Sequence, residues 1–398
     1  MIVRWQRGVP VYGVRILSGA FLATAAVAAI GVVLIIYRQI VGLEATTGMT
    51  DRYPWGIWKT FNTMVLTALG SGSFAIGIAA WIFKKRALHS VMRVSLLISF
   101  LVYATGLLAL GVDVGRPWNF WNMLLPWHWN THSPLWEVAL CMPLYAFFPL
   151  LLENTPPVLE RVYYLYPQSQ PPIRWLVPII RATYPWVVAL AYVLPLLHQS
   201  SLGALMLIAG PRLHPLWNTG WLPLLFLLSC IGIGYAAVVF ETVLSSWLFK
   251  TRPERDMLAG IAAAIVPFSA AYVALRLVDL AIRGQIGALF AFDLFSVLTL
   301  LELALTIAAT LMLASESRRR RLGDLFRAAM LFMLAGTLYR FDTYLVAFRP
   351  GAHWSYFPSV AELLITLGLV AGEIMLYIAI VKVFPILTLE KRHVAYHH

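Results

Sequence analysis

Ten long apolar runs constrain this chain more than any other feature of its sequence. They lie at residues 13–36, 60–83, 91–112, 133–152, 184–208, 221–248, 257–282, 289–314, 325–347 and 359–386. A helix needs about 20 mostly apolar residues to cross the hydrocarbon core of a membrane. Hydrophobic residues make up 60% of the chain and charged residues only 12%, which excludes an ordinary soluble domain and a disordered chain. We therefore predict an all-α integral membrane protein with about ten transmembrane helices.

The basic residues predict the orientation of these helices. If the N-terminus is cytoplasmic, most of the 30 Lys and Arg residues, including the run Arg318–Arg321, fall on the cytoplasmic side. Both termini are then predicted to be cytoplasmic. Arg340 is assigned to the opposite side, and Arg276 lies inside a span. The net charge of +12 is thus explained by topology and anionic headgroups, and we expect no nucleic-acid partner.

Four neighbouring helix ends bring polar groups to a similar height at the predicted outer face. These groups are Trp55, Lys59, Asp113, Arg116, Glu137, His198 and Gln199. A quinone headgroup needs donors for two carbonyl oxygens and two exchangeable protons, and an imidazole supplies both near neutral pH. We therefore predict a quinone site there. The structural alternatives are an ion pair between Asp113 and Arg116 and a histidine that is satisfied in the helix interior.

Buried acids at other depths suggest a second role. Glu153 falls at the inner end of its span and Glu241 in the inner half of its span, and Glu137 and Glu241 could belong to one proton relay. Hydrogen-bonded contacts between helices are the alternative for each. Arg276 and Asp279 lie one turn apart, and we interpret them as a self-satisfied pair. Further acids lie on the later spans: Asp293, Glu302, Glu362 and Glu373.

Residues for resident metals and cofactors are scarce. The sequence has 9 histidines, but only His198 is well inside a span, so a haem held by two histidines is not expected. The only two cysteines, Cys141 and Cys230, cannot hold an iron–sulfur cluster. We predict no metal site. Residues 153–183, rich in Pro and Tyr, are expected to form a long connection between spans.

Several longer motifs carry a family resemblance. They are Pro54–Trp58, Asp113–Asn119, Ser133–Met142, His198–Leu205, Phe240–Glu241, Leu345–Gly351 and Tyr356–Pro358, followed by Glu362 and Glu373. Taken in order, these motifs resemble the HybB-type branch of the NrfD/polysulfide reductase family of membrane subunits. The similarity covers essentially all ten predicted spans.

The resemblance implies an architecture and a location. Two four-helix bundles, helices 2–5 and 6–9, would be flanked by helices 1 and 10. The corresponding regions are 1–52, 53–210, 211–350 and 351–398, and the quinone site belongs to the second of them. Such subunits are multi-pass proteins of a bacterial-type inner membrane.

The resemblance also implies a function. The protein would be a haem-free subunit without an iron–sulfur cluster of its own. It would pass electrons between an extrinsic periplasmic iron–sulfur subunit and menaquinone or ubiquinone. The periplasmic catalytic subunits would be those of a nickel–iron hydrogenase, and turnover could drive proton translocation.

Carried over by motif, the outer site comprises Asp113, Arg116, Glu137 and His198, with Tyr103 below them. The proton route comprises Glu137, Glu153 and Glu241. The alternatives are a subunit of a sulfur-compound, multi-haem or molybdopterin complex, a transporter, or a passive membrane anchor.

Overall fold

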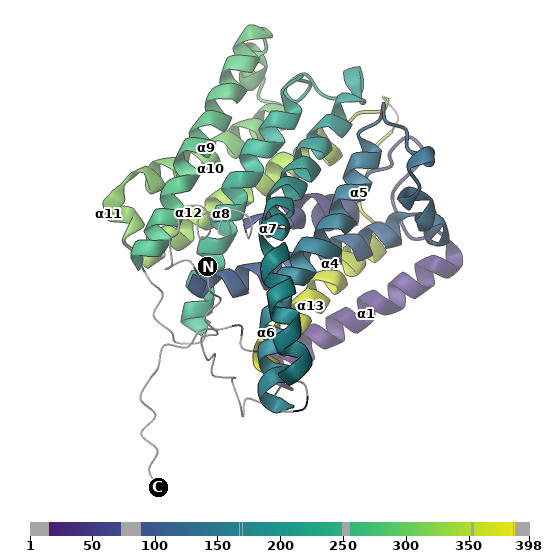
Figure 1. Ribbon diagram of the computed structural model, residues 1–398. Coiled ribbons are helices and arrows are strands. Elements are labelled where there is room, and N and C mark those ends of the chain that lie inside the picture. The colour runs from purple at the N-terminus through teal and green to yellow at the C-terminus, as the bar shows by residue number, and fades with distance from the viewer. Residues whose placement is uncertain are drawn as a thin grey trace.

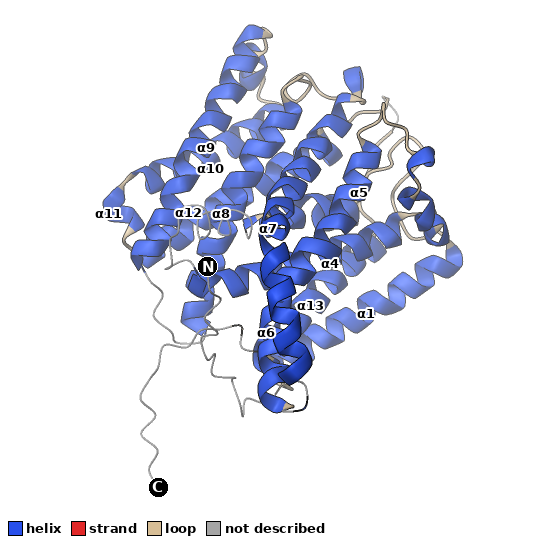
Figure 2. Ribbon diagram, in the orientation of Figure 1, coloured by secondary structure: helices blue, strands red, loops and turns tan. Residues whose placement is uncertain are grey.

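The structure, a computed structural model, describes residues 16–72, 89–166, 168, 170–248, 255–351, 354–384 and 386. Every regular element in these residues is a helix (Figure 2). Nine helices of the described part are long and apolar enough to cross a membrane. The predicted all-α integral membrane fold is therefore confirmed. The second predicted span, 60–83, lies partly outside the described residues.

The long helices follow the apolar runs. In sequence order, with their direct continuations, they are α1 (Gly19–Val41), η1 and α2 (Lys59–Val65, Leu66–Gly70), α4 (His89–Asp113), α5, η5 and α6 (Leu135–Tyr145, Ala146–Leu150, Leu151–Leu165), α7 (Gln170–Leu207), α8 (Leu222–Leu248), α9 (Arg255–Ile282), α10 (Leu294–Ala314), α12 and η9 (Leu322–Phe341, Asp342–Val346) and α13 (Val360–Val383). Short helices lie in the connections: η3 (Pro117–Leu124), η4 (Pro126–His128), η7 (Gly210–Arg212), η8 (Ile286–Phe290) and α11 (Glu316–Arg319).

The predicted connection at 153–183 is wrong. The helix that begins at Leu135 continues through α6 to Leu165, and α7 starts at Gln170, so almost all of this segment is helical. Pro171 and Pro172 fall in the first turn of α7, where the missing N–H of proline costs no hydrogen bond. The interior prolines of α7 are tolerated because neighbouring groups in a membrane bundle can satisfy the freed carbonyls. Proline content alone therefore gave a misleading loop signal.

The helices pack into two groups (Figure 1). α2, α4, α5, α6 and α7 form one group, and α8, α9, α10 and α12 form the other. α8 joins them by packing against both α7 and α2. α1 and α13 lie side by side along the first group, where α13 also contacts α4. This packing agrees with the expected pair of bundles, whereas the boundaries at 53–210 and 211–350 stay a prediction.

Small residues set the closest helix crossings. A Cβ on Gly368 of α13 would lie 2.5 Å from the Cα of Gly31 on α1. A Cβ on Gly72 would lie 2.3 Å from the carbonyl oxygen of Gly234 on α8. Backbones approach this closely in membranes only where side chains are absent, because dispersion contacts drive helix association there. Gly31 and Gly368 therefore allow α1 and α13 to pack closely, and Gly72 and Gly234 allow the first helix group to pack closely against α8.

One end of the molecule carries the longer connections, and we call it the loop-rich end. It comprises residues 42–58, 113–134, 208–221, 283–293, 347–351 and 354–359. Glu362 organises part of it, because its carboxylate accepts from the backbone N–H of Gly48 at 2.8 Å and from the Tyr356 hydroxyl at 2.9 Å. Burial and the neighbouring Glu362 raise the pKa of Tyr356, so this phenol stays neutral and can donate. Glu362 also completes a capping box with Ser359, so its role is structural.

Candidate functional site

His198 lies at the centre of a buried polar cluster in the first helix group. Its imidazole is fully buried on α7, and neither ring nitrogen has a hydrogen-bond partner of good geometry among the described residues. The ring centroid of Tyr103, from α4, lies 6.1 Å away, and the Tyr103 hydroxyl is likewise buried and unpartnered there. Two adjacent buried groups with unused donors and acceptors are costly unless a water or ligand contacts them. The backbones of Thr63 and Val138 also lie near the ring, so a satisfied interior histidine stays the structural alternative to a histidine that contacts a ligand.

Glu137 joins this cluster through α7. The Ser201 hydroxyl, one turn after His198, donates to Glu137 Oε2 at 2.6 Å. The backbone of Val138, the next residue after Glu137, lies near the His198 ring. Glu137 falls in the first turn of α5, where the positive end of the helix dipole favours a carboxylate. The Glu137 carboxyl thus contacts α7 at Ser201, one helical turn after His198.

Gln199 connects the cluster to the second helix group. Its amide donates to the Thr67 hydroxyl at 2.9 Å and its carbonyl oxygen accepts from Arg340 at 2.8 Å. Arg340 is fully buried in α12, and its guanidinium also donates to Ser229 Oγ at 3.3 Å and lies 5.2 Å from the Phe226 ring centre. A polar bridge therefore crosses from α7 to α12.

The assignment of Arg340 to the outer side was wrong. The residue lies inside the predicted span 325–347, between Tyr339 and Phe341, and that position was the available signal. Buried arginines in membranes are found in the bundle interior with polar partners. We call the set Tyr103, Glu137, His198, Gln199, Ser201 and Arg340 the His198 cluster.

A second cluster lies nearer the loop-rich end. Asp113 forms an ion pair with Lys59 and accepts a hydrogen bond from the Trp58 indole at 2.9 Å. The Lys59 ammonium lies 5.2 Å from the Trp55 ring centre, in cation–π range. We call the set Trp55, Trp58, Lys59 and Asp113 the Lys59 cluster.

Arg116 does not join either cluster. It is exposed and precedes η3, while Asp113 pairs with Lys59. The alternative of a structural Asp113–Arg116 pair is therefore wrong, because α4 ends between the two residues and η1 brings Lys59 closer. Ten residues of α4, about 15 Å of helix, separate Tyr103 from Asp113. The polar groups predicted at one height thus lie at two levels.

The remaining acids of the predicted proton route lie apart from the His198 cluster. Glu153 is buried on α6, and its Oε2 has no partner among the described residues. Glu241 on α8 has a buried Oε1 that is likewise unpartnered, and it interacts electrostatically with Glu373 of α13. Thr105 of α4 lies near the Glu373 carboxyl. Glu373, which the predicted route omitted, therefore lies between Glu241 and the helix that carries Tyr103.

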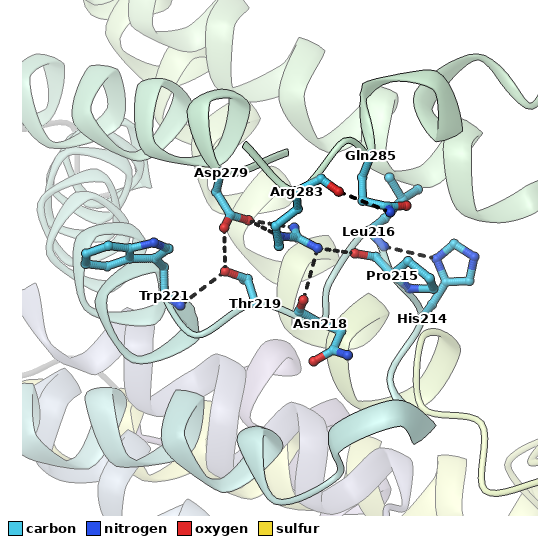
Figure 3. Close-up of polar contacts among 9 residues, drawn as sticks. All are labelled: His214, Pro215, Leu216, Asn218, Thr219, Trp221, Asp279, Arg283 and Gln285. Atoms are coloured by element: carbon cyan, nitrogen blue, oxygen red, sulfur yellow. Dashed lines mark hydrogen bonds and ion pairs between the residues drawn. The ribbon is translucent and has the colours of Figure 1, made fainter. Parts of the chain in front are cut away.

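The interpretation of Arg276 and Asp279 as a pair is wrong. Asp279 accepts from Arg283 at 2.6 Å and from Thr219 at 2.8 Å (Figure 3). Arg283 also donates to the carbonyls of Pro215 and Asn218, which closes the loop-rich end of the second group (Figure 3). Spacings of three and four residues both bring side chains together on a helix, so sequence alone could not choose. Arg276 is left buried inside the second group, without a hydrogen bond to any described residue.

The described residues do not fit a haem held by two histidines. His198 is the single histidine of the described apolar spans, since the span of α4 begins at Met92, after His89. His128 and His132 lie in the connection before α5. His214 lies in a loop and stacks on Phe295, with ring centroids 4.1 Å apart. No group of three or more His, Cys, Asp or Glu residues that could hold a metal ion occurs in the part of the sequence that the structure describes.

Fold and clusters together define a multi-pass membrane protein with a buried polar cluster in its interior. The protein belongs to the NrfD family: the family described as "Polysulphide reductase, NrfD" matches residues 45–347. This match covers most of the spans and both polar clusters.

Three relatives of the protein have names that refer to oxidoreductase complexes. The protein is 32% identical over 380 residues, 94% of each sequence, to the "Probable Ni/Fe-hydrogenase 2 b-type cytochrome subunit" of Escherichia coli strain K12. It is 29% identical over 204 residues, 50% of its own length and 46% of the relative, to the "Menaquinone reductase, integral membrane subunit" of Nitratidesulfovibrio vulgaris. It is 28% identical over 195 residues, 45% of its own length and 59% of the relative, to a component of the polysulfide reductase of Wolinella succinogenes.

Proposed function

We propose that this protein is the quinone-reactive membrane subunit of a respiratory oxidoreductase complex. The observation that carries the proposal is the pair of buried, unpartnered groups His198 and Tyr103 beside Glu137, as the described residues surround them. A quinone carbonyl is an acceptor, so it would satisfy the donors that the protein itself leaves unused. The name of the menaquinone reductase relative supports the same substrate class, menaquinone or ubiquinone.

The reaction balances as quinone plus two electrons and two protons giving quinol. The electrons come from an extrinsic iron–sulfur subunit. In this proposal His198 and Tyr103 contact the headgroup, while Glu137 delivers or accepts protons and Ser201 positions its carboxyl. Gln199 forms hydrogen bonds with Thr67 and Arg340, and these bonds hold the segment of α7 that carries His198 in position. Lys59 and Asp113 form the entrance on the loop-rich side, and Arg116 lies outside it.

We propose that the partner is the electron-transfer subunit of a nickel–iron hydrogenase, since the Escherichia coli relative, which matches over 94% of its length, carries a hydrogenase name. The loop-rich end offers a docking face, because Trp118, Trp121 and Trp127 are exposed there and Trp129 stacks on Trp136. Polysulfide reductase or another reductase complex is the alternative partner. We also propose a haem-free subunit in an inner membrane with cytoplasmic termini, because the described histidines do not supply two ligands at matching depth.

The test compares two electron acceptors in the purified complex. Glu137→Gln and His198→Ala are each expected to abolish most quinone-linked turnover, while the catalytic subunits still reduce an artificial dye. Ser246→Ala is the matched control, since this buried hydroxyl donates to the backbone of Val243 in its own helix. Full quinone activity in both site variants would reject the site. Loss of dye activity as well would favour a passive anchor, and substrate uptake by vesicles without a redox partner would favour a transporter.

Proton translocation through Glu137, Glu153 and Glu241 is a separate proposal. It rests on two acids of different helices, Glu153 and Glu241, because Glu153 Oε2 and Glu241 Oε1 are buried and lack partners among the described residues. Proteoliposomes that contain the complex and turn over quinone should then develop a membrane potential. Active turnover without any potential would exclude a route through Glu153 and Glu241.

A further inference from the structure

An apolar cavity opens between three helices at the end of the molecule opposite the loop-rich end. Its volume is about 260 Å³. α4 packs against both α6 and α13 (Figure 1). The lining includes Leu97 and Phe100 of α4, Leu151 and Val158 of α6, and Ile380 and Phe384 at the end of α13. The first helix group and the flanking helix α13 therefore enclose one apolar space, to which the proposed function assigns no role.

The polar side chains of the described lining, Asn154 and Thr155, already use their hydrogen-bond donors. The Asn154 amide donates to the backbone carbonyls of Leu150 at 2.8 Å and Leu96 at 3.1 Å. The Thr155 hydroxyl donates to the backbone carbonyl of Leu151 at 2.8 Å. An amide has two such hydrogens and a hydroxyl has one, so these side chains offer none to a quinone carbonyl. The cavity therefore fits a hydrocarbon chain better than a quinone headgroup.

The cavity opens on a surface that faces lipid. Leu151 and Val158 belong to the lining, yet 48% and 40% of their surface is exposed. Phe147 and Phe148, in the turn before Leu151, are exposed as well. An apolar cavity of about 150 Å³ can already hold a benzene molecule. Because the solvent around this helix face is hydrocarbon, an acyl chain can enter this larger cavity from the side.

A guanidinium lies at the rim of the cavity. Arg161 follows Val158 by about one turn of α6. It donates to the backbone carbonyl of Val383, the last residue of α13, and its guanidinium lies 5.8 Å from the ring centre of Phe384. Phe384 belongs to the lining. A cation is thus held where the apolar cavity reaches the ends of α6 and α13.

The charges around this rim sum to a positive value. Arg93, in the second turn of α4, forms an ion pair with Glu160 at 2.9 Å, so two guanidiniums face one carboxylate. Lys382 adds an ammonium near the end of α13. The next acids on α6 and α13 are Glu153 and Glu373, and they lie about 12 Å or more from the rim along their helices. The rim therefore favours an anion.

We propose that this cavity binds an acyl chain of an anionic phospholipid, with the phosphate of the lipid paired to Arg161. Guanidinium is well suited to phosphate, and basic pockets between transmembrane helices bind anionic headgroups. The order of groups also matches a phospholipid, with the charge at the helix ends and the apolar space deeper in the membrane. The bound lipid fastens α13 to α4 and α6. This proposal is independent of the quinone site.

The test uses the purified complex and phosphatidylglycerol with a photoreactive diazirine in one acyl chain. Peptide mapping is expected to find label around Val158 of α6 and Leu97 of α4. Unlabelled phosphatidylglycerol should displace this label about fivefold better than phosphatidylcholine with the same chains, because one arginine near a membrane surface favours an anionic lipid by roughly that factor. Equal displacement by both lipids would indicate ordinary bulk lipid and overturn the proposal. Stronger displacement by quinone would assign the cavity to a quinone tail and also overturn it.

Matched variants separate the charge from the cavity. Arg161→Gln should keep the label but lose the preference for phosphatidylglycerol, whereas Arg161→Lys should retain the preference. Arg174→Gln, which removes an exposed arginine at the start of α7, should change neither.

Val158→Trp should fill the cavity and remove the label, whereas Val193→Trp, at an exposed valine of α7, should not. An unchanged label in Val158→Trp, or an unchanged preference in Arg161→Gln, would overturn the proposal. If Arg161→Gln does not assemble, the Val158 and Val193 pair still decides whether the chain occupies the cavity, and the two lipids compared on the wild type decide its charge.

Discussion

The variant Ser201→Ala tests whether the hydrogen bond from Ser201 to Glu137 is needed for quinone reduction at the His198 cluster. The substitution removes one hydroxyl from a helix and leaves the rest of α7 unchanged. The hydroxyl donates to Glu137 Oε2 at 2.6 Å, a length typical of a bond to a charged oxygen. Such bonds contribute about 1.5–3 kcal/mol.

This energy converts directly into a rate if the bond holds Glu137 in place for proton transfer. Each ~1.4 kcal/mol of lost transition-state stabilisation lowers a rate about tenfold. Quinone-linked turnover of Ser201→Ala is therefore expected to fall about 10- to 150-fold. Because Ser201 acts through Glu137, dye reduction by the complex should stay at the wild-type level.

The assay measures both rates on the purified complex, with amounts matched by protein quantification. Ser201→Thr, which keeps a hydroxyl, is expected to retain most of the quinone activity. Ser246→Ala controls for the loss of a buried serine elsewhere in the bundle. An unchanged quinone rate in Ser201→Ala, with Glu137→Gln still inactive, would refute the positioning role.

Three further predictions concern stability in detergent. Burial lowers the pKa of His214 in the folded protein below its unfolded value of about 6.5. Below that pH the unfolded state binds more protons than the folded state, which destabilises the fold. The melting temperature should therefore fall on acidification below about pH 6.5, and less so in His214→Gln. Arg283→Met removes the ion pair to Asp279 and should cost about 1.5–3 kcal/mol in unfolding measurements; an unaltered unfolding curve would show that another group neutralises this acid. Gly368→Ala should destabilise the protein by about 1–3 kcal/mol, whereas Gly372→Ala, whose nearest neighbour would lie at 3.8 Å, should be neutral; equal effects would contradict the close crossing.

The membrane spans were predictable because the bilayer imposes one strong rule on the sequence. Any segment that crosses must be apolar for about 20 residues, and that condition is visible without knowing a single contact. The prediction was wrong where proline residues, which are common in loops, occur in the first turn of a helix. The Pro-rich start of α7 was interpreted as a connection, although proline is compatible with the first turn of a helix.

The polar contacts were only partly predictable, because they depend on how each helix is rotated about its axis. The bond between Ser201 and Glu137 joins residues 64 apart, and that between Arg340 and Gln199 joins residues 141 apart. The residue types on α5 and α7 were visible in the sequence, whereas their pairing was not. Asp279 illustrates the same limit at short range, since it pairs with Arg283 at a spacing of four residues and not with the arginine at three.

The central claim is that quinone reacts beside His198. Photolabelling of the complex with an azido-quinone, followed by peptide mapping, tests it most directly. We expect label in the segments around Tyr103, Glu137 and His198, and excess unmodified quinone should displace it. The structure offers a distinct rival, an apolar cavity of about 260 Å³ at the opposite end, lined by residues that include Leu97, Asn154 and Ile380. Displaceable label confined to that cavity, with none near His198, would contradict the account.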